Sequence, residues 1–309
     1  MRPSAARDLS LTQLAYFVAA AEHGSMTQAA ASLFVAQSAV STSIGNLEAS
    51  LGTKLFLRRR TKGLLLTASG AELLTRARGI IAAVEEAVDA LRPESVSGRL
   101  ETACFSTLAP FYLPEVLQTM AEEYPELSLH VRDLGADGIN EALTSHAIEV
   151  ALTYDLGLDP GLQLERLATV PLYAAVATSH PLASRTEVSL AELATEPMVL
   201  LDMPVSRDYF LGAFLERGLT PVVGHRFASF EAVRAMVARE HGFTLLHQKP
   251  ALDHTYDGRM LHTMAITDQV PGLDIVLATA GPTLSRRARA FTEHCRRAVQ
   301  PPASPPLAE

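Results

Sequence analysis

Two groups of side chains near the start of the sequence have the chemistry to contact a nucleic acid. The first group comprises short polar residues on one side of a predicted helix over residues 37–51: Gln37, Ser38, Ser41 and Thr42. The second group is a run of cations further along the chain: Arg58, Arg59, Arg60 and Lys62. Amides and hydroxyls bond base edges, whereas lysine and arginine neutralise phosphates. The pattern therefore predicts base contacts from the helix and backbone contacts from the basic run.

Two short helices are expected ahead of this polar helix. Ser10 and Gln13, and likewise Ser25 and Gln28, have the spacing of a capping box. Apolar residues follow each serine at helical spacing: Leu11, Leu14, Phe17, Val18 and then Ala29, Ala30, Leu33. The third helix has its own apolar side: Val40, Ile44, Leu47 and Leu51. This order predicts a helix-turn-helix, and Gln28 joins the residues expected to contact DNA.

A basic hairpin is predicted after the third helix. Residues 53–57 and 64–66 are expected to form two strands, with the basic run crowding a turn that ends at Gly63. Such a wing can lie along the phosphate backbone. Thr67 then has the position of a cap for a long helix.

Taken together, these residues resemble the N-terminal domain of the LysR-type transcriptional regulators. The matching positions are Leu14, Phe17, Gly24, Ser25, Ala29, Ala30, Leu33, Gln37, Ser38, Ala39, Val40, Ser41, Ile44, Leu47, Glu48, Leu51, Gly52, Leu55, Phe56, Arg58, Leu66, Thr67 and Gly70. The resemblance implies a winged helix-turn-helix that binds double-stranded DNA. The alternative is a small helical bundle that binds nothing, but such a bundle needs neither the polar helix start nor the basic hairpin.

The sequence departs from the family pattern within the third helix. Ala36 stands where the family usually has a serine or threonine cap, which typically costs about 1 kcal/mol. Gly45 inside the helix costs roughly another 1 kcal/mol relative to alanine. The basic residues often found in this helix are replaced by Thr42, Ser43 and Asn46. We therefore expect the wing to provide most of the phosphate contacts.

The charge of the chain is divided between a basic start and an acidic remainder. The net charge is −8. Residues 1–66 carry seven basic and three acidic side chains, a balance of +4, whereas residues 93–309 carry sixteen and twenty-seven, a balance of −11. Screening beyond about 10 Å lets the basic end bind phosphate independently of the acidic body.

A long helix over residues 68–91 should connect the two parts of the chain. Its apolar residues form three rows at heptad spacing: Leu73, Ile80, Ala87; Leu74, Ile81, Val88; and Ala77, Val84, Leu91. Such a stripe either packs on the helix's own domain or pairs with a second copy of the helix. The neighbouring module is too small to cover the whole stripe, which favours a dimer helix. The family resemblance implies an antiparallel pair and a homodimer or homotetramer.

The rest of the chain alternates predicted strands and helices, which indicates parallel sheets with helices on both faces. The resemblance implies a periplasmic-binding-protein-like fold of two α/β lobes around a cleft for a small-molecule effector. The predicted fold class is thus multidomain: a winged helix-turn-helix, a linker helix and a two-lobed α/β domain. The expected boundaries are 1–67, 68–92, 93–300 and a disordered tail 301–309, with lobe I about 98–168 plus 266–300 and lobe II about 169–265.

Effector contacts are expected where strands end beside helix N-termini. The candidate residues are Ser106, Thr107, Asp202, Ser206, Ser229, Phe230 and His247. The three serines could equally be helix caps, and the two roles are compatible. Asp202 would welcome an amine or a hydroxyl-rich ligand, or could itself cap a helix. His247 could bond the effector or lie solvated at its strand end.

The same sequence argues against other functions. A nucleophile elbow, a phosphate-binding loop and a His-Glu-x-x-His motif are all missing from it, so neither catalysis nor a cofactor or metal is expected. The alternative to a regulator is a two-lobed receptor or enzyme without a role at DNA. No apolar run could span a membrane, and residues 1–9 lack the apolar core of a secretory signal. A bacterial cytoplasmic location at the nucleoid is therefore expected.

Two cysteines, Cys104 and Cys295, lie far apart in the sequence. They form no metal-binding or redox spacing, and we expect both to be buried thiols. The LysR-type regulators that sense oxidants use a nearby cysteine pair, which this chain lacks.

Overall fold

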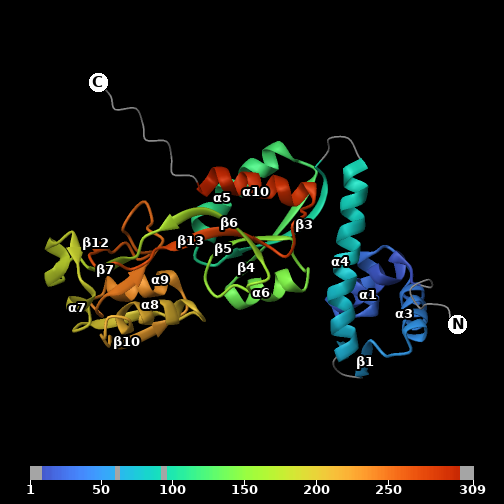
Figure 1. Ribbon diagram of the computed structural model, residues 1–309, viewed down its shortest axis with the longest axis horizontal. Coiled ribbons are helices and arrows are strands. Elements are labelled where there is room, and N and C mark those ends of the chain that lie inside the picture. Colours follow the sequence, from blue (N-terminus) through green and yellow to red (C-terminus); the bar gives the residue numbers. More distant parts are fainter. Residues whose placement is uncertain (1–8, 60–62, 92–95, 300–309) are drawn as a thin grey trace. The chain divides into compact units, whose positions relative to one another are not determined.

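The computed structural model describes residues 9–59, 63–91 and 96–299 (Figure 1). The chain divides into two compact units. The first contains Met1–Ser95 with the short segments Ala142–Glu149 and Thr283–Arg286, and the second contains the remaining residues. The predicted Arg60, Lys62 and tail 301–309 lie outside the described residues.

Three short helices open the first unit: α1 (Leu11–His23), α2 (Met26–Ser32) and α3 (Gln37–Leu51). The capping box at α1 is confirmed, because the Gln13 amide donates to Ser10 Oγ at 3.1 Å and the Ser10 amide donates to Gln13 Oε1 at 2.9 Å. At α2 the structure contains the serine half of the predicted box, a bond from the Gln28 amide to Ser25 Oγ at 3.3 Å.

The wing consists of β1 (Phe56–Arg59) and β2 (Gly63–Leu66), which pair antiparallel from Phe56 opposite Leu66 to Arg59 opposite Gly63. The prediction of a strand over residues 53–57 was wrong in its bounds. The amides of Leu55 and Phe56 bond the Glu48 carboxylate of α3, so the strand starts at Phe56. Arg58 and Arg59 consequently belong to the strand and not to the turn.

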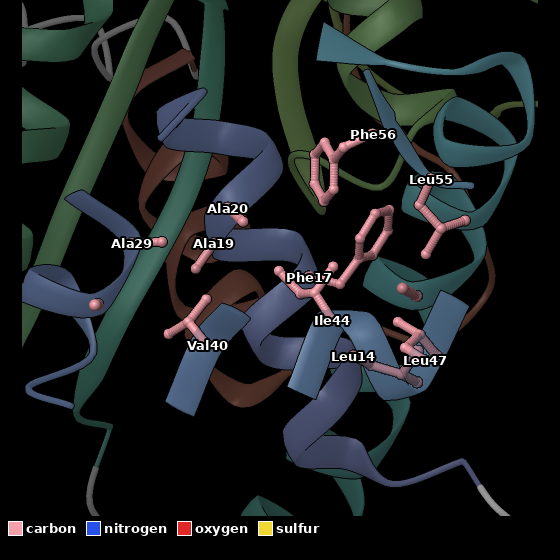
Figure 2. Close-up of a cluster of buried hydrophobic side chains, with 12 residues drawn as sticks. Leu14, Phe17, Ala19, Ala20, Ala29, Val40, Ile44, Leu47, Leu55 and Phe56 are labelled. Atoms are coloured by element: carbon pink, nitrogen blue, oxygen red, sulfur yellow. The ribbon is translucent and has the colours of Figure 1, made fainter. Parts of the chain in front are cut away.

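The core of this unit surrounds Phe17, which is fully buried. Figure 2 shows its ring beside that of Phe56, within the cluster of buried side chains. The rings of Phe17 and Phe56 lie 5.3 Å apart at 53°, so α1 and the wing share one core. Gly70 allows the next helix to approach, because a Cβ there would lie 2.2 Å from the Leu55 carbonyl oxygen.

Helix α4 (Ala68–Leu91) is capped as predicted by Thr67, whose Oγ1 accepts from the Gly70 amide at 2.9 Å. Its apolar stripe divides into a part that is packed and a part that is exposed. Leu73, Leu74, Ala77 and Ile81 pack against the core of the winged module. Ile80, Val84 and Val88 are 47%, 37% and 43% exposed. The stripe therefore serves its own domain along one part and leaves another part open.

Lobe I of the second unit is built on a five-stranded sheet in the order β4-β3-β5-β13-β6. The strands are β3 (Gly98–Phe105), β4 (Leu127–Leu134), β5 (Val150–Tyr154), β6 (Gln163–Val170) and β13 (Leu273–Thr279). The helices are α5 (Ala109–Glu123), α6 (Ala136–Thr144) and α10 (Arg286–Val299). Figure 1 shows the red α10 beside α5. The late return of strand and helix to lobe I is confirmed.

Lobe II contains a four-stranded sheet in the order β11-β7-β12-β8 and a parallel pair of strands, β9 and β10. The strands are β7 (Tyr173–Ala177), β8 (Glu187–Val188), β9 (Pro197–Leu201), β10 (Val222–Phe227), β11 (Thr244–Leu246) and β12 (Leu261–Ile266). The helices are α7 (Leu190–Leu193), α8 (Ser206–Leu215) and α9 (Phe230–Val237), with a 3₁₀ turn, η2 (Pro181–Ser184).

The prediction of parallel sheets was wrong, because both lobes have mixed sheets. β13 runs antiparallel to β5 and β6, and β7 runs antiparallel to β11 and β12. The sequence also predicts a helix from Pro114 to Tyr124, but α5 starts earlier, at Ala109. The amides of Phe111 and Tyr112 bond the Leu108 carbonyl, which closes a turn ahead of Pro114. Among the described residues, no helix is long and apolar enough to cross a membrane.

Candidate DNA-binding face and effector cavity

The polar side of α3 is open to solvent while its other side is buried. Gln37, Ser38 and Thr42 are exposed, and Ser41 is half-buried. Val40, Ile44 and Leu47 hold the opposite side in the core shared with α1. Gln28 at the start of α2 is also exposed. The structure thus leaves the predicted base-contacting side chains available.

Phe34 is a candidate that the sequence pattern did not reveal. It lies in the turn between α2 and α3, is 96% exposed and has a φ of 56°, which is rare for a bulky residue. An aromatic ring at the entrance to the polar helix could pack on a thymine methyl group or a sugar. The sequence signal that could have indicated Phe34 is a large apolar residue directly after Leu33 and outside the apolar positions of the predicted helices.

Glu48 fixes the wing to α3. Its carboxylate accepts from the Leu55 amide at 2.9 Å and the Phe56 amide at 3.3 Å, and it pairs with Lys54. Burial raises the pKa of Glu48, but these hydrogen bonds outweigh burial and hold it below its usual value. The carboxylate is therefore ionised, and it sets where β1 starts.

The second unit contains two neighbouring spaces between its lobes. The outer cleft has a volume of about 650 Å³, and Ser106, Thr107, Ser229 and Phe230 contribute to its lining. The inner cavity is far smaller, about 20 Å³, and its lining includes Thr107, Ser206, Phe230 and His247. The structure therefore brings all the predicted effector residues except Asp202 to these spaces.

Asp202 faces two arginines instead. Its carboxylate bonds Arg207 at 3.1 Å and Arg226 at 3.5 Å. Because these two cations already match its charge, Asp202 has no reason to attract an amine into the cleft, and we leave it out of the effector site.

Of the three serines, Ser229 combines capping with cavity lining, whereas the N-cap positions of α5 and α8 are Leu108 and Val205, so the capping alternative was wrong for Ser106 and Ser206. Ser229 caps α9 by accepting from the Ala232 amide at 3.3 Å, and it also lines the outer cleft. Ser206 begins α8 just after Val205, whose φ of 66° is strained for a β-branched residue. That backbone presents Ser206 to the inner cavity.

His247 is buried, so the alternative of a solvated strand end was wrong. Its Nδ1 lies 3.2 Å from the Val170 carbonyl oxygen, and its ring stacks on Phe210 with centroids 5.9 Å apart. Burial lowers the pKa of His247 to about 4, against the opposing effect of the Val170 and Pro171 carbonyls. The imidazole is therefore neutral at physiological pH.

The other polar residues of the inner cavity are also uncharged. Burial raises the pKa of Tyr154 and of Tyr209 to about 12. Gln248, which follows His247 in the strand-end segment where effector contacts were expected, accepts from the Tyr112 hydroxyl at 3.5 Å.

The outer cleft contains one buried ion pair. Arg234 bonds Glu231 at 2.7 Å, donates to the His254 carbonyl at 2.9 Å and lies 5.7 Å above the centre of the Phe230 ring. Glu231 also accepts from the Tyr256 amide at 2.6 Å. These contacts tie the segment after β11 to α9 and balance the arginine's charge.

The thiols of Cys104 and Cys295 are buried as predicted, and burial raises the pKa of both. Such thiols are poor nucleophiles and react slowly with oxidants. Within the described ranges, His, Cys, Asp and Glu form no cluster that could hold a metal.

Comparison with known families agrees with both parts of the structure. Residues 11–71 match the family described as bacterial regulatory helix-turn-helix protein, lysR family, and residues 93–300 match the LysR substrate binding domain. The chain belongs to the LysR family. The resemblance stated from sequence and the predicted fold class are thus confirmed. This LysR-type protein is a DNA-binding transcriptional regulator with an effector-binding domain.

Individual relatives cover most of this LysR-type chain. It is 33% identical to a probable hydrogen peroxide-inducible genes activator of Streptomyces viridosporus, over 88% of each chain. HinK, a LysR family transcriptional regulator from Pseudomonas aeruginosa, is 33% identical with a TM-score of 0.63, over 94% of this chain and 98% of HinK. Full-length CbnR, solved in complex with its target DNA, is 25% identical with a TM-score of 0.54, over 94% of this chain and all of CbnR.

Proposed function

We propose that this regulator reads promoter DNA with the exposed side of α3, while the wing grips the phosphate backbone. Gln28, Gln37, Ser38, Ser41 and Thr42 would face bases, and Arg58, Arg59, Arg60 and Lys62 would face phosphates. The observation that carries the proposal is the Glu48 carboxylate, which joins the polar helix and the basic hairpin into one unit. CbnR, which was solved in complex with its target DNA, supports DNA as the ligand of this unit.

Anisotropy titrations with the chain's own upstream DNA and with scrambled DNA, at several salt concentrations, test this proposal. The double variant Arg58→Ala/Arg59→Ala should weaken binding to both DNAs and lower the salt slope by about one per lost cation. Ser41→Ala should change the ratio between the two DNAs. Arg76→Ala on α4, whose partner is Glu72, is the control. A wing variant with an unchanged salt slope would contradict the proposal.

We further propose that a small molecule between the lobes controls DNA binding, and that the exposed part of α4 pairs two copies of the chain. The cavity residues Ser106, Thr107, Ser206, Ser229, Phe230 and His247 support the first statement. The effector can shift the conformational equilibrium only by its differential affinity for the two states. We also propose that the protein acts as a regulator at the nucleoid and has no catalytic activity.

A further inference from the structure

Two residues that line the inner cavity each have a buried polar atom without a hydrogen-bond partner in the described part of the chain. His247 and Gln248 are 8% and 5% exposed, and both line this cavity. His247 Nε2 and Gln248 Nε2 have no hydrogen-bond partner among the described residues. A buried polar atom costs free energy when it stays unpaired, so both atoms call for a partner inside the cavity.

The two atoms have opposite hydrogen-bonding roles. His247 donates from Nδ1 to the Val170 carbonyl, which leaves a lone pair on Nε2 of the neutral ring. Gln248 accepts from Tyr112 through Oε1, which leaves its NH₂ group as a donor. The cavity therefore offers one acceptor and one donor from consecutive residues.

This pairing favours an uncharged group. Among the described residues, the lining of the inner cavity includes no Asp, Glu, Lys or Arg. A carboxylate would face the lone pair of His247, and an ammonium would face the amide hydrogens of Gln248. A hydroxyl group satisfies both atoms at once, since it donates to one and accepts from the other.

The volumes indicate what carries this hydroxyl. A space of about 20 Å³ holds a group of the size of water, not a ring. Thr107 and Phe230 line both spaces, so the outer cleft of about 650 Å³ begins where the inner cavity ends. Its apolar lining includes Phe111, Met203 and Pro250. A ring or short hydrocarbon chain fits there.

We propose that the effector is a small uncharged alcohol or phenol whose hydroxyl enters the inner cavity between His247 and Gln248. This ligand class rests on the proposed effector-binding function. The apolar body of the molecule lies in the outer cleft against Phe230.

Calorimetric titration of the full-length protein with three probes tests the ligand class: benzyl alcohol, benzyl methyl ether and benzoate. Benzyl alcohol should bind about tenfold more tightly than the ether, which lacks the donor. The Gln248→Met variant should reduce this preference to about threefold or less. Gln118→Met, an exposed position on α5, should leave it unchanged.

If Gln248→Met fails to fold, the preference of the wild-type protein for the alcohol over the ether tests the proposal by itself. Equal binding of alcohol and ether, stronger binding of benzoate, or no saturable binding overturns the proposal. Tight binding of benzoate would overturn the ligand class but would still support effector binding between the lobes. Failure to bind promoter DNA would instead refute the proposed function, whatever the probes do.

Discussion

Glu48 shows how one side chain can determine the geometry of a DNA-binding surface. Its carboxylate is 11% exposed and accepts two backbone amides at the point where β1 begins. Hydrogen bonds to a charged acceptor contribute about 1.5–3 kcal/mol each. Because the folded pKa is lowered, this contribution is complete at neutral pH and is lost as the pH falls through the folded pKa.

Replacing Glu48 with Gln should loosen the wing without unfolding the body. The carboxylate oxygen Oε1 accepts both amides and Oε2 pairs with Lys54, whereas Gln keeps one neutral acceptor and turns an NH₂ group toward Lys54, so the free energy of local opening at residues 55–59 should fall by about 2 kcal/mol. Hydrogen exchange of the full-length protein measures this directly. Glu72→Gln, on the exposed Glu72–Arg76 pair, is the control. Unchanged exchange at Leu55 and Phe56 would show that the wing does not depend on this carboxylate.

His247 should make the stability of the second unit depend on pH. Its folded pKa of about 4 lies below the unfolded value near 6.5, so its contribution is complete above that unfolded value and is lost as the pH falls toward 4. From pH 7 to pH 5 the loss should be about 2 kcal/mol. Urea unfolding at both pH values, compared with His247→Asn, gives this difference. The exposed His130→Asn serves as control, and a pH response shared by all three proteins argues against the assignment.

At this scale the sequence could locate residues but not their partners. The positions after strands correctly indicated Thr107, Ser206, Phe230 and His247 as cavity residues. The pairing of Asp202 with Arg226 depends on the parallel contact of β9 and β10, which links positions distant in the sequence. Gln248 and Tyr154 meet only because both lobes fold around one space.

Two helical glycines differ in what surrounds them. Gly45 in α3 has open space where a Cβ would be, whereas a Cβ at Gly70 in α4 would meet the backbone of Leu55. Gly45→Ala should therefore stabilise α3 by up to about 1 kcal/mol. Gly70→Ala should destabilise the unit by roughly 1–3 kcal/mol. Hydrogen exchange of residues 11–51 measures the stability of the unit in both variants. The two predictions are refuted if both substitutions change the stability in the same direction.

Elements with one strong periodic pattern were predictable, but the edge strand β6 was not. The helices α1 to α4 follow from caps and apolar spacing. Strand β6 was missed because most of its residues are exposed and half of them are polar, without strict alternation. The strand direction in the sheets could not be read from alternation, because β13 pairs with strands more than a hundred residues earlier.

Across the whole molecule, the exposed apolar residues of α4 should control assembly. Val84→Glu would place a charge among Ile80, Val84 and Val88 and should convert the proposed dimer to a monomer in light scattering. Ala71→Glu, exposed and off the stripe, should leave the mass unchanged. A Val84→Glu protein that keeps the wild-type mass would place the pairing surface elsewhere.

The central place of β13 has a consequence for biosynthesis. This strand lies between β5 and β6, yet it is translated last of the five. During synthesis, the sheet of lobe I cannot be completed until the chain has been translated as far as Thr279. The winged module, by contrast, has its complete core within residues 9–81 and can fold early. A nascent chain released before β13 would thus carry a working DNA-binding module that no effector could govern.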